Sequence, residues 1–254
     1  LDNGIAIVNL YSPFNEYVDK LGNLGLVYAA LNHEGHLYLG TNQGLFYRES
    51  ASQDNFSLID GTEGQVWNLQ FLDSTIFCGH NNGTFIIDKT QAELISDYPG
   101  TWGVKPIKGH SNLLLQGNYN GLSILEKVEG TWKFRNAIDG FTISSRFFEM
   151  DSLQIVVDHE KKGLYFIELD PSFREVKQVT NVERIGHSSN IFSFQDELYY
   201  KTNAGIYNID GANDIVLDST MTQMIFNQND EQVSIIIPEN SEQRLWFFTK
   251  YGLQ

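Results

Sequence analysis

The stretch Gly35-His36-Leu37-Tyr38-Leu39-Gly40-Thr41-Asn42-Gln43-Gly44-Leu45 joins a short apolar run to a second one through a turn that ends in glycine. Related sequence recurs along the chain at intervals of roughly 40 residues. Each copy carries a glycine at the same phase: Gly4, Gly44, Gly83, Gly121, Gly163, Gly205 and Gly252. A period of this length, built from short apolar runs and turns, predicts a β-propeller in which each repeat forms one four-stranded antiparallel blade.

The run before each of the later glycines is apolar at two adjacent positions. These pairs are Leu37 and Tyr38, Ile76 and Phe77, Leu114 and Leu115, Val156 and Val157, Leu198 and Tyr199, and Leu245 and Trp246. Adjacent residues of a strand point to opposite faces, so both faces of this strand are apolar. That pattern predicts a strand in the middle of a blade, packed between two neighbouring blades.

One complete repeat predicts an inner strand at Val27–Leu31, a turn at His33–Gly35 and a second strand at His36–Gly40, followed by Leu45–Glu49 and Phe56–Asp60. The repeat glycine is expected to supply the positive φ of the connection before the third strand. The inner strands of later repeats are expected near Val66–Phe71, Trp102–Ile107, Arg146–Met150, Asn190–Phe194 and Gln232–Ile237.

Counting by repeat phase gives six inner and six outer strand pairs over residues 1–254, which we treat as a single all-β propeller domain. The first outer pair is expected at Gly4–Asn9 and near Tyr17, and the last inner pair ends just before Leu253. A six-bladed ring could then close by sharing one blade between the chain ends, which removes open sheet edges. A segment excised from a longer array of repeats would also begin and end at the same point of the repeat. The strand count therefore fits both a closed six-bladed ring and such a segment.

The composition fits one globular unit and disfavours several functions. Hydrophobic residues make up 41% of the chain, and its formal net charge is −15. No basic stripe is visible, so we expect no direct nucleic-acid binding, which depends on Lys and Arg neutralising phosphates. The pair Lys161 and Lys162 is expected at a solvated hairpin tip. No apolar run reaches the length of a membrane span, so no membrane insertion by this segment is expected.

The search for catalytic or metal chemistry favours structural explanations. His33-Glu34-Gly35-His36 spans a predicted hairpin, and Cys78-Gly79-His80 falls at the end of a buried second strand. The repeats supply no third ligand, so we expect no metal and no cofactor. The acidic residues cannot be paired across a cleft from sequence alone, so no catalytic residue is assigned. A glycosidase or lyase stays an alternative only because propellers host such enzymes.

The strongest candidates for a site are aromatic residues near the starts of the inner strands, where propeller geometry brings residues toward the central axis. Counting back from the repeat glycines gives Tyr28, Trp67 and Phe147, with Trp102 at the corresponding place in a longer hairpin and Arg146 beside Phe147. Aromatic faces with a few polar groups suit a sugar or another planar ligand, and arginine suits a carboxylate. The competing explanation is that these rings only pack neighbouring blades together.

The stretch from Gly35 to Leu45 resembles the Gly-Asn-Leu-Trp-Ile-Gly-Thr-x-x-Gly-Leu repeat of two-component-regulator propellers. Asp2-Asn3-Gly4-Ile5, Gly61-Thr62-Glu63-Gly64-Gln65-Val66-Trp67 and Phe77-Cys78-Gly79-His80-Asn81-Asn82-Gly83-Thr84-Phe85 are similar to bacterial triple-tyrosine-domain regulators with a LuxR-type helix-turn-helix output. The likeness covers most of the chain. Repeats four and five lose the Gly-Thr pair and have His159-Glu160 and Lys201-Thr202 in its place.

The resemblance implies a periplasmic sensor segment of an inner-membrane protein that continues into a triple-tyrosine domain, a membrane helix and an output module. Propellers of the family that the chain resembles usually have seven blades. The alternative to a closed six-bladed ring is therefore that this chain forms part of a seven-bladed ring. The expected function is non-enzymatic ligand binding in signal transduction and transcription regulation, with a small molecule or oligosaccharide as partner. The alternative is a structural domain that packs against a neighbouring propeller, other domains of the parent regulator or a homodimer mate.

Overall fold

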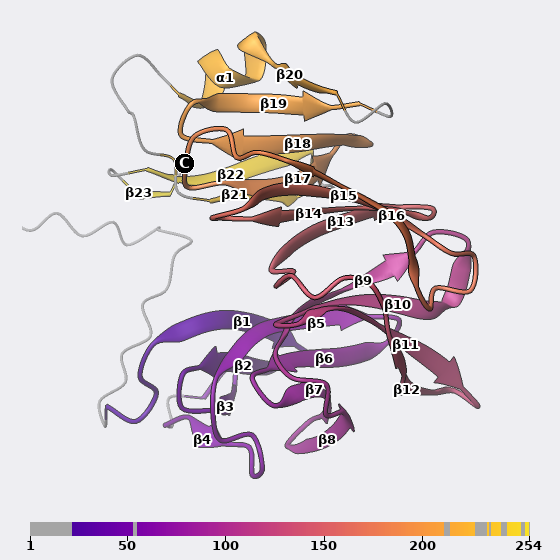
Figure 1. The fold of residues 1–254 in the computed structure, drawn as a ribbon. Coiled ribbons are helices and arrows are strands. Elements are labelled where there is room, and N and C mark those ends of the chain that lie inside the picture. The colour runs from indigo at the N-terminus through magenta and orange to yellow at the C-terminus, as the bar shows by residue number, and fades with distance from the viewer. Residues whose placement is uncertain are drawn as a thin grey trace, which may run out of the picture.

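A computed structural model describes residues 22–52, 55–210, 214–226, 233, 235–239, 243–249 and 252–253. The chain forms successive antiparallel sheets, each built from strands that follow one another in the sequence (Figure 1). Five sheets have four strands and the last has three among the described residues. This is the meander of propeller blades that the repeat predicts, and the sheets are called blades one to six below.

The blades contain strands of two to nine residues. Blades one and two comprise β1 (Val27–His33), β2 (His36–Thr41), β3 (Leu45–Glu49), β4 (Ser57–Leu58), β5 (Val66–Leu72), β6 (Thr75–His80), β7 (Gly83–Asp88) and β8 (Gln91–Ser96). Blades three and four comprise β9 (Thr101–Ile107), β10 (His110–Asn118), β11 (Gly121–Val128), β12 (Thr131–Ala137), β13 (Phe147–Asp151), β14 (Gln154–His159), β15 (Gly163–Leu169) and β16 (Val176–Val182). Blades five and six comprise β17 (Asn190–Phe194), β18 (Glu197–Thr202), β19 (Gly205–Ile209), β20 (Ile215–Leu217), α1 (Ser219–Ile225), β21 (Ile236–Glu239), β22 (Arg244–Thr249) and β23 (Gly252–Leu253).

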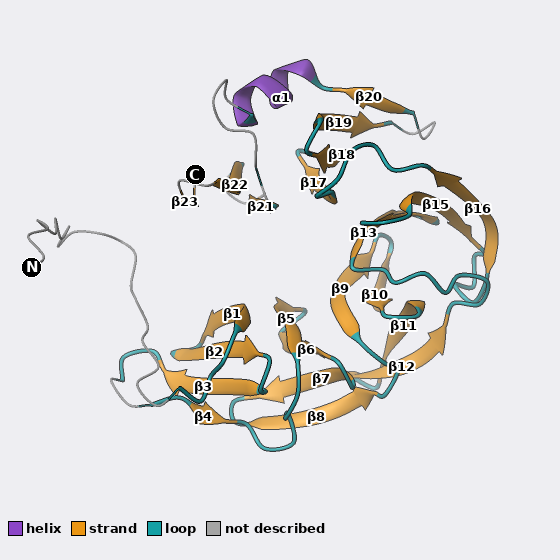
Figure 2. Cartoon of the chain, turned by 60° about the vertical axis from the view of Figure 1, so that its left-hand side comes forward, coloured by secondary structure: helices purple, strands orange, loops and turns teal. Residues whose placement is uncertain are grey.

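The blades follow one another around an arc (Figure 2). The first strand of each blade contacts the first strand of the next, so β1, β5, β9, β13, β17 and β21 line the inner side. Blade one and blade six stand at the two ends of the arc in this view. The outer pair expected at Gly4–Asn9 and near Tyr17 lies outside the described residues, so six or seven blades and the mode of closure stay open predictions.

The strand positions follow the repeat closely. The strands predicted at Leu45–Glu49 and Asn190–Phe194 are β3 and β17 with the same bounds. Strand β13 begins at Phe147, one residue after the predicted start. Strand β21 begins at Ile236, and the predicted start at Gln232 lies outside the described residues.

The repeat pattern did not predict helix α1, which follows β20 on the outer side of blade five. The Asp218 carboxylate caps its N-terminus by accepting a hydrogen bond from the Met221 N–H at 2.8 Å. The Thr222 hydroxyl accepts a hydrogen bond from the Ile206 N–H at 2.9 Å, which ties the helix to β19. Ile225 is its buried residue. The short helix therefore covers the outer edge of the blade.

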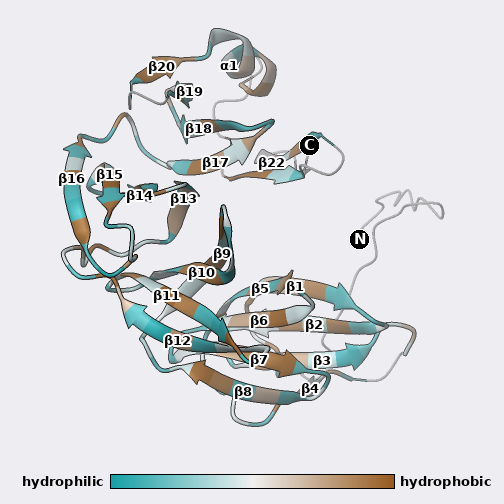
Figure 3. Ribbon diagram, turned by 90° about the vertical axis from the view of Figure 1, so that its right-hand side faces the viewer, coloured by the Kyte–Doolittle hydropathy of each residue, from teal (hydrophilic) through white to brown (hydrophobic). Residues whose placement is uncertain are grey.

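The apolar core is divided among the boundaries between blades. One buried cluster joins Val66, Leu69 and Ile76 of blade two to Tyr38 and Leu45 of blade one. Further clusters lie between blades two and three, three and four, four and five, and five and six. The hydropathy view shows apolar segments on middle strands such as β6 and β7, and the outer strands β12 and β16 are largely polar (Figure 3). The middle strands are therefore apolar on both faces, as predicted, because both faces meet a neighbouring blade.

Two physical constraints require glycine at the repeat position. Five of these glycines adopt positive φ, between 88° at Gly163 and 152° at Gly44, as the sequence predicts. In addition, a Cβ atom at Gly163 would lie 2.2 Å from the Val182 carbonyl oxygen on the outer strand of the same blade. The position therefore excludes side chains by backbone conformation and by space.

A second position, which we call the seam position, brings neighbouring blades together. Gly40, Gly79 and Gly117 occupy it in blades one to three, and a Cβ at Gly117 would lie 2.1 Å from the Ser145 carbonyl oxygen of blade four. The strand registers place Asp158 and Lys201 there in blades four and five. The sequence comparison that put His159-Glu160 at the Gly-Thr pair was wrong by one residue, because the turn before Gly163 is one residue longer than its counterparts.

We predict that Gly163→Ala lowers the stability of the fold by about 2 kcal/mol or more, since it combines a strained φ with a clash. Gly130 is the matched control because its φ of 83° is close to the 88° of Gly163, yet no atom lies within 4 Å of its added Cβ. Gly130→Ala should cost about 1 kcal/mol. Denaturant unfolding of both variants measures the difference, and equal midpoints would contradict the spatial requirement.

Candidate functional site: an aromatic row at the inner strand starts

Three of the predicted site residues occupy the same structural feature. Tyr28, Trp67 and Trp102 are the extra residues of β-bulges in β1, β5 and β9, each located where two inner-strand positions oppose one on the second strand. A bulge leaves its residue out of the regular ladder and redirects its side chain. The repeat therefore presents one aromatic residue in each of blades one to three at the same rim of the arc.

The corresponding position in blade four is held by Arg146 and not by Phe147. Phe147 pairs with Asp158, as Gly103 pairs with Gly117 in blade three. Arg146 lies just before β13, where Trp102 lies in blade three. Counting back from Gly163 missed this by one residue because of the longer turn in blade four.

The five predicted residues form one continuous row. The ring centroids of Tyr28 and Trp67 are 5.0 Å apart, and those of Trp67 and Trp102 are also 5.0 Å apart. The Arg146 guanidinium carbon lies 5.3 Å from the Trp102 ring and 5.2 Å from the Phe147 ring, within the range of cation–π contacts. Residues from four blades, which are far apart in sequence, thus meet side by side. Whether they bind a ligand stays a prediction.

Tyr119 joins this row and was not predicted. Its hydroxyl accepts a hydrogen bond from the Trp67 indole N–H at 2.6 Å, and its ring centroid lies 5.0 Å from that of Trp102. The same position in blades one, two and five holds Asn42, Asn81 and Asn203, whose side-chain oxygens accept hydrogen bonds from the segment before the inner strand. The replacement of a repeated asparagine by tyrosine is the sequence signal that could have identified it.

We call Tyr28, Trp67, Trp102, Tyr119, Arg146 and Phe147 the aromatic row. Tyr28 is 42% exposed, Arg146 is exposed, and the other members are partly buried. The rings thus pack across blade boundaries, as expected if they serve to hold neighbouring blades together. They also keep part of their surface exposed to solvent. Packing and ligand contact are compatible uses of the same side chains.

A pocket of about 260 Å³ lies at one end of the row. We call it the Arg146 pocket, and its lining comprises Trp102, Ser144, Arg146, Phe147, Asp158, His159, Glu160 and Lys161. The Trp102 indole N–H donates to the Ser144 hydroxyl at 3.1 Å, which fixes the orientation of that ring. The pocket therefore combines an oriented aromatic face with charged groups of both signs.

Asp158 is the most unusual group in this pocket. It is 1% exposed, its Oδ1 accepts a hydrogen bond from the Ser189 hydroxyl at 3.0 Å, and its Oδ2 has no hydrogen-bond partner. Burial raises the pKa of the Asp158 carboxyl to about 6, against the lowering effects of the Ser189 hydrogen bond and of Lys201. A buried carboxylate oxygen without a partner is costly unless a donor reaches it.

Lys201 occupies the next seam position and is buried as well. Its ammonium group donates to the Ser188 carbonyl oxygen at 2.7 Å. Burial lowers the pKa of Lys201 to about 8, while Asp158 acts in the opposite direction. Two glycines of the repeat pattern are therefore replaced by a pair of opposite charges that lie inside the protein near the pocket.

The other sequence candidates have structural roles. Glu34 and Gly35 adopt positive φ in the hairpin between His33 and His36, as a tight hairpin turn requires. Cys78 is buried in β6, and burial raises the pKa of its thiol. Among the described residues no group of three His, Cys, Asp or Glu side chains is placed to hold a metal ion. No described helix is long and apolar enough to cross a membrane.

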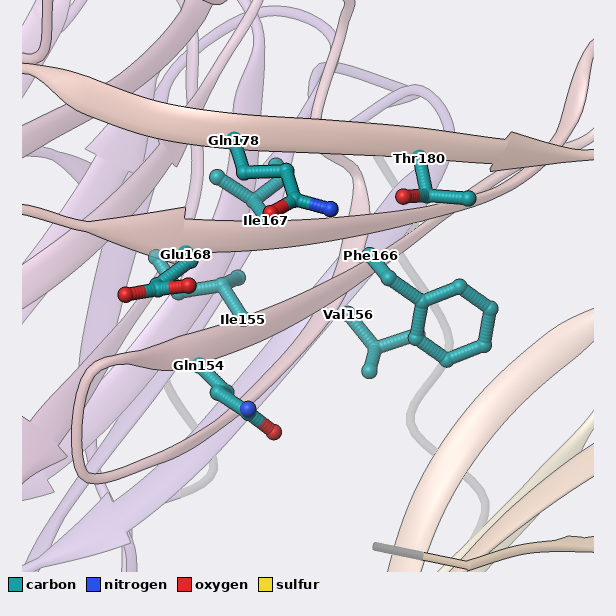
Figure 4. A pocket seen from close by; sticks show the side chains of 8 residues that line it. All are labelled: Gln154, Ile155, Val156, Phe166, Ile167, Glu168, Gln178 and Thr180. Carbon is teal, nitrogen blue, oxygen red and sulfur yellow. The ribbon is translucent and has the colours of Figure 1, made fainter. Parts of the chain in front are cut away.

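Two further hollows lie at the boundary between blades four and five. The smaller one is lined by strands β14, β15 and β16 of blade four (Figure 4), and its Val156 and Phe166 belong to the buried cluster between these blades. The larger one, of about 800 Å³, shares Gln154 and Val156 with it and has several carboxylates on its walls. Neither contains a predicted site residue.

Comparison with known proteins supports the fold. No protein-family model matches the chain, and a search of curated proteins also returned no match. Among solved structures, the extracellular domain of BT3049 from B. thetaiotaomicron, described as a hybrid two-component system, aligns over 91% of this chain with 12% identity and a TM-score of 0.62. The extracellular domain of BT4673 from the same organism, described as a one-component system, aligns over 93% with 16% identity and a TM-score of 0.60.

The WD40 β-propeller domain of Doa1 is similar as well, with 9% identity over 89% of this chain and a TM-score of 0.58. The chain is a β-propeller. It spans 33% of the length of each of the two B. thetaiotaomicron domains and 76% of the Doa1 chain.

We predict that Asp158 makes stability fall as pH rises from about 4 to about 6. Its folded pKa of about 6 exceeds the unfolded value, so the native state binds more protons in this window and loses relative stability as the proton leaves. Asp158→Asn removes this dependence. Between pH 4 and pH 7 the unfolding free energy of the wild type should therefore fall relative to that of the variant, by at most about 3 kcal/mol. Urea unfolding at pH 4 and pH 7 measures it, and parallel pH profiles would contradict the assignment. The neighbouring charges Glu160 and Lys201 are the same in both proteins.

Proposed function

We propose that this propeller is the ligand-binding sensor segment, located in the periplasm, of a membrane-spanning regulator of the two-component or triple-tyrosine type. The observation that carries the proposal is the aromatic row. Tyr28, Trp67, Trp102 and Arg146 stand at equivalent positions of four successive blades and contact one another in series. A repeated fold that concentrates exposed aromatic groups at one rim offers a platform for a ligand.

A glycan is the ligand class that suits this platform best. Sugar rings present apolar faces that pack on aromatic side chains, together with hydroxyl groups that need hydrogen-bond partners at their edges. The row supplies the faces, while Asp158 and Ser144 supply polar groups in the Arg146 pocket. The proposed role is binding without turnover, and binding biases the signalling state of the parent protein. The similarity to extracellular domains of bacterial one-component and two-component systems supports this setting.

The second candidate function is a structural domain that packs against a neighbouring propeller or a second copy of the chain. One observation favours it: Leu26 is 66% exposed and Val27 is 48% exposed at the first blade. The corresponding strand in blade five, β17, is largely buried on both faces. Sedimentation velocity over a wide concentration range separates the two functions, because a self-association surface gives a dimer without any ligand.

We predict that oligosaccharides that bind this protein raise its melting temperature, and that Trp67→Ala and Trp102→Ala each weaken binding by about tenfold or more. A thermal-shift screen of a glycan library followed by calorimetry tests this. Phe134→Ala is the control, since Phe134 is 37% exposed on the outer strand β12, away from the row. Unchanged affinity in both tryptophan variants would remove the proposed site.

A further inference from the structure

The Arg146 pocket contains two opposite charges that the protein itself leaves available. Asp158 is one of the lining residues of the pocket, and its Oδ2 is buried without a hydrogen-bond partner. Arg146 makes no hydrogen bond or ion pair with any described residue, and its guanidinium is held over the rings of Trp102 and Phe147. A stacked guanidinium keeps its N–H donors free at the edge of its plane, where they bind a carboxylate through two parallel hydrogen bonds.

Three further charged groups and a histidine lie near Arg146 and Asp158. Lys161 and Glu160 also line the pocket and are exposed, so solvent screens both. Lys201 is close enough to Asp158 to act against the rise in its pKa, and its ammonium group also donates to the Ser188 carbonyl oxygen. His159 is at the pocket wall, and burial together with Lys162 lowers its pKa, which keeps it neutral near pH 7. Arg146 is therefore the cation on the aromatic side, and Asp158 is the acceptor at the buried end.

We infer that the Arg146 pocket binds a sugar residue that carries a carboxylate, that is, a uronic acid. Its carboxylate pairs with Arg146, one of its hydroxyls donates to Asp158 Oδ2, and its ring packs on Trp102. This inference rests on the proposed function and names its ligand class.

The size and position of the pocket fit one sugar ring of an oligosaccharide. Its volume of about 260 Å³ falls below the range of about 300–1,000 Å³ that is usual for drug-sized ligands. Further rings of an oligosaccharide can lie on Trp67 and Tyr28, since the aromatic row runs from Trp102 through Trp67 to Tyr28. The pocket thus selects one acidic residue, and the row extends the contact.

The test is calorimetric titration with two matched pairs: tri-galacturonate against its neutral counterpart α-1,4-galactotriose, and methyl glucuronide against methyl glucoside. We expect the acidic member of at least one pair to bind about tenfold tighter, as for one charge-assisted hydrogen-bond pair. Arg146→Gln should abolish this preference, so that the acidic and the neutral member of each pair bind with similar affinity. Asp158→Asn should weaken the binding of the acidic and the neutral sugar to a similar extent, because both sugars have the hydroxyl that donates to Asp158.

Arg174→Gln is the matched control, since it removes the same charge from an exposed site on the outer side of blade four. Equal affinity for acidic and neutral sugars, or an unchanged preference in Arg146→Gln, overturns the inference. If the neutral sugars alone bind and Trp102→Ala abolishes their binding, the inference fails while the proposed function stands. If no sugar binds, both fail.

Discussion

Neighbouring blades meet at one position of the second strand, and the rest of the structure depends on how closely they approach there. In blades one to three this seam position is glycine, because a Cβ would come within 2.5 Å of Val66 Cγ1 at Gly40 and of the Thr101 carbonyl oxygen at Gly79. The close approach lets apolar clusters form between blades one and two and between blades two and three. It also sets the distance between the bulged residues of successive inner strands, which is why their rings are in contact.

Blades four and five depart from this rule, and the departure coincides with the candidate site. Asp158 and Lys201 replace the seam glycines, so blades four and five have buried charged side chains at the position where blades one to three have none. Buried charges seldom increase stability over apolar packing. Their presence beside the Arg146 pocket is consistent with a requirement of ligand binding, and Asp158 connects the two because it belongs to both the seam and the pocket.

Much of the architecture could be predicted from sequence because the repeat carries it. The phase of the glycines located most strands, and the apolar pairs identified the strand that is packed on both faces. The aromatic residues were found for the same reason, since Tyr28 and Trp67 share a repeat position. The predictions that failed are residue assignments that depend on the length of a loop. One extra residue before Gly163 moved Arg146 into the place assigned to Phe147 and moved Asp158 into the place assigned to His159. Tyr119 was missed because its contact with Trp67 joins residues from different blades.

The central claim is that the aromatic row is a binding platform and does more than pack blades together. The chain has four tryptophans, and their indole N–H groups give separate signals in a proton–nitrogen correlation spectrum. Trp67 and Trp102 belong to the row, whereas Trp132 is buried in the boundary between blades two and three. Titration with the oligosaccharide that binds most tightly should shift the Trp67 and Trp102 indole signals and leave the Trp132 signal in place. Saturable binding that leaves the Trp67 and Trp102 signals unmoved would contradict the account.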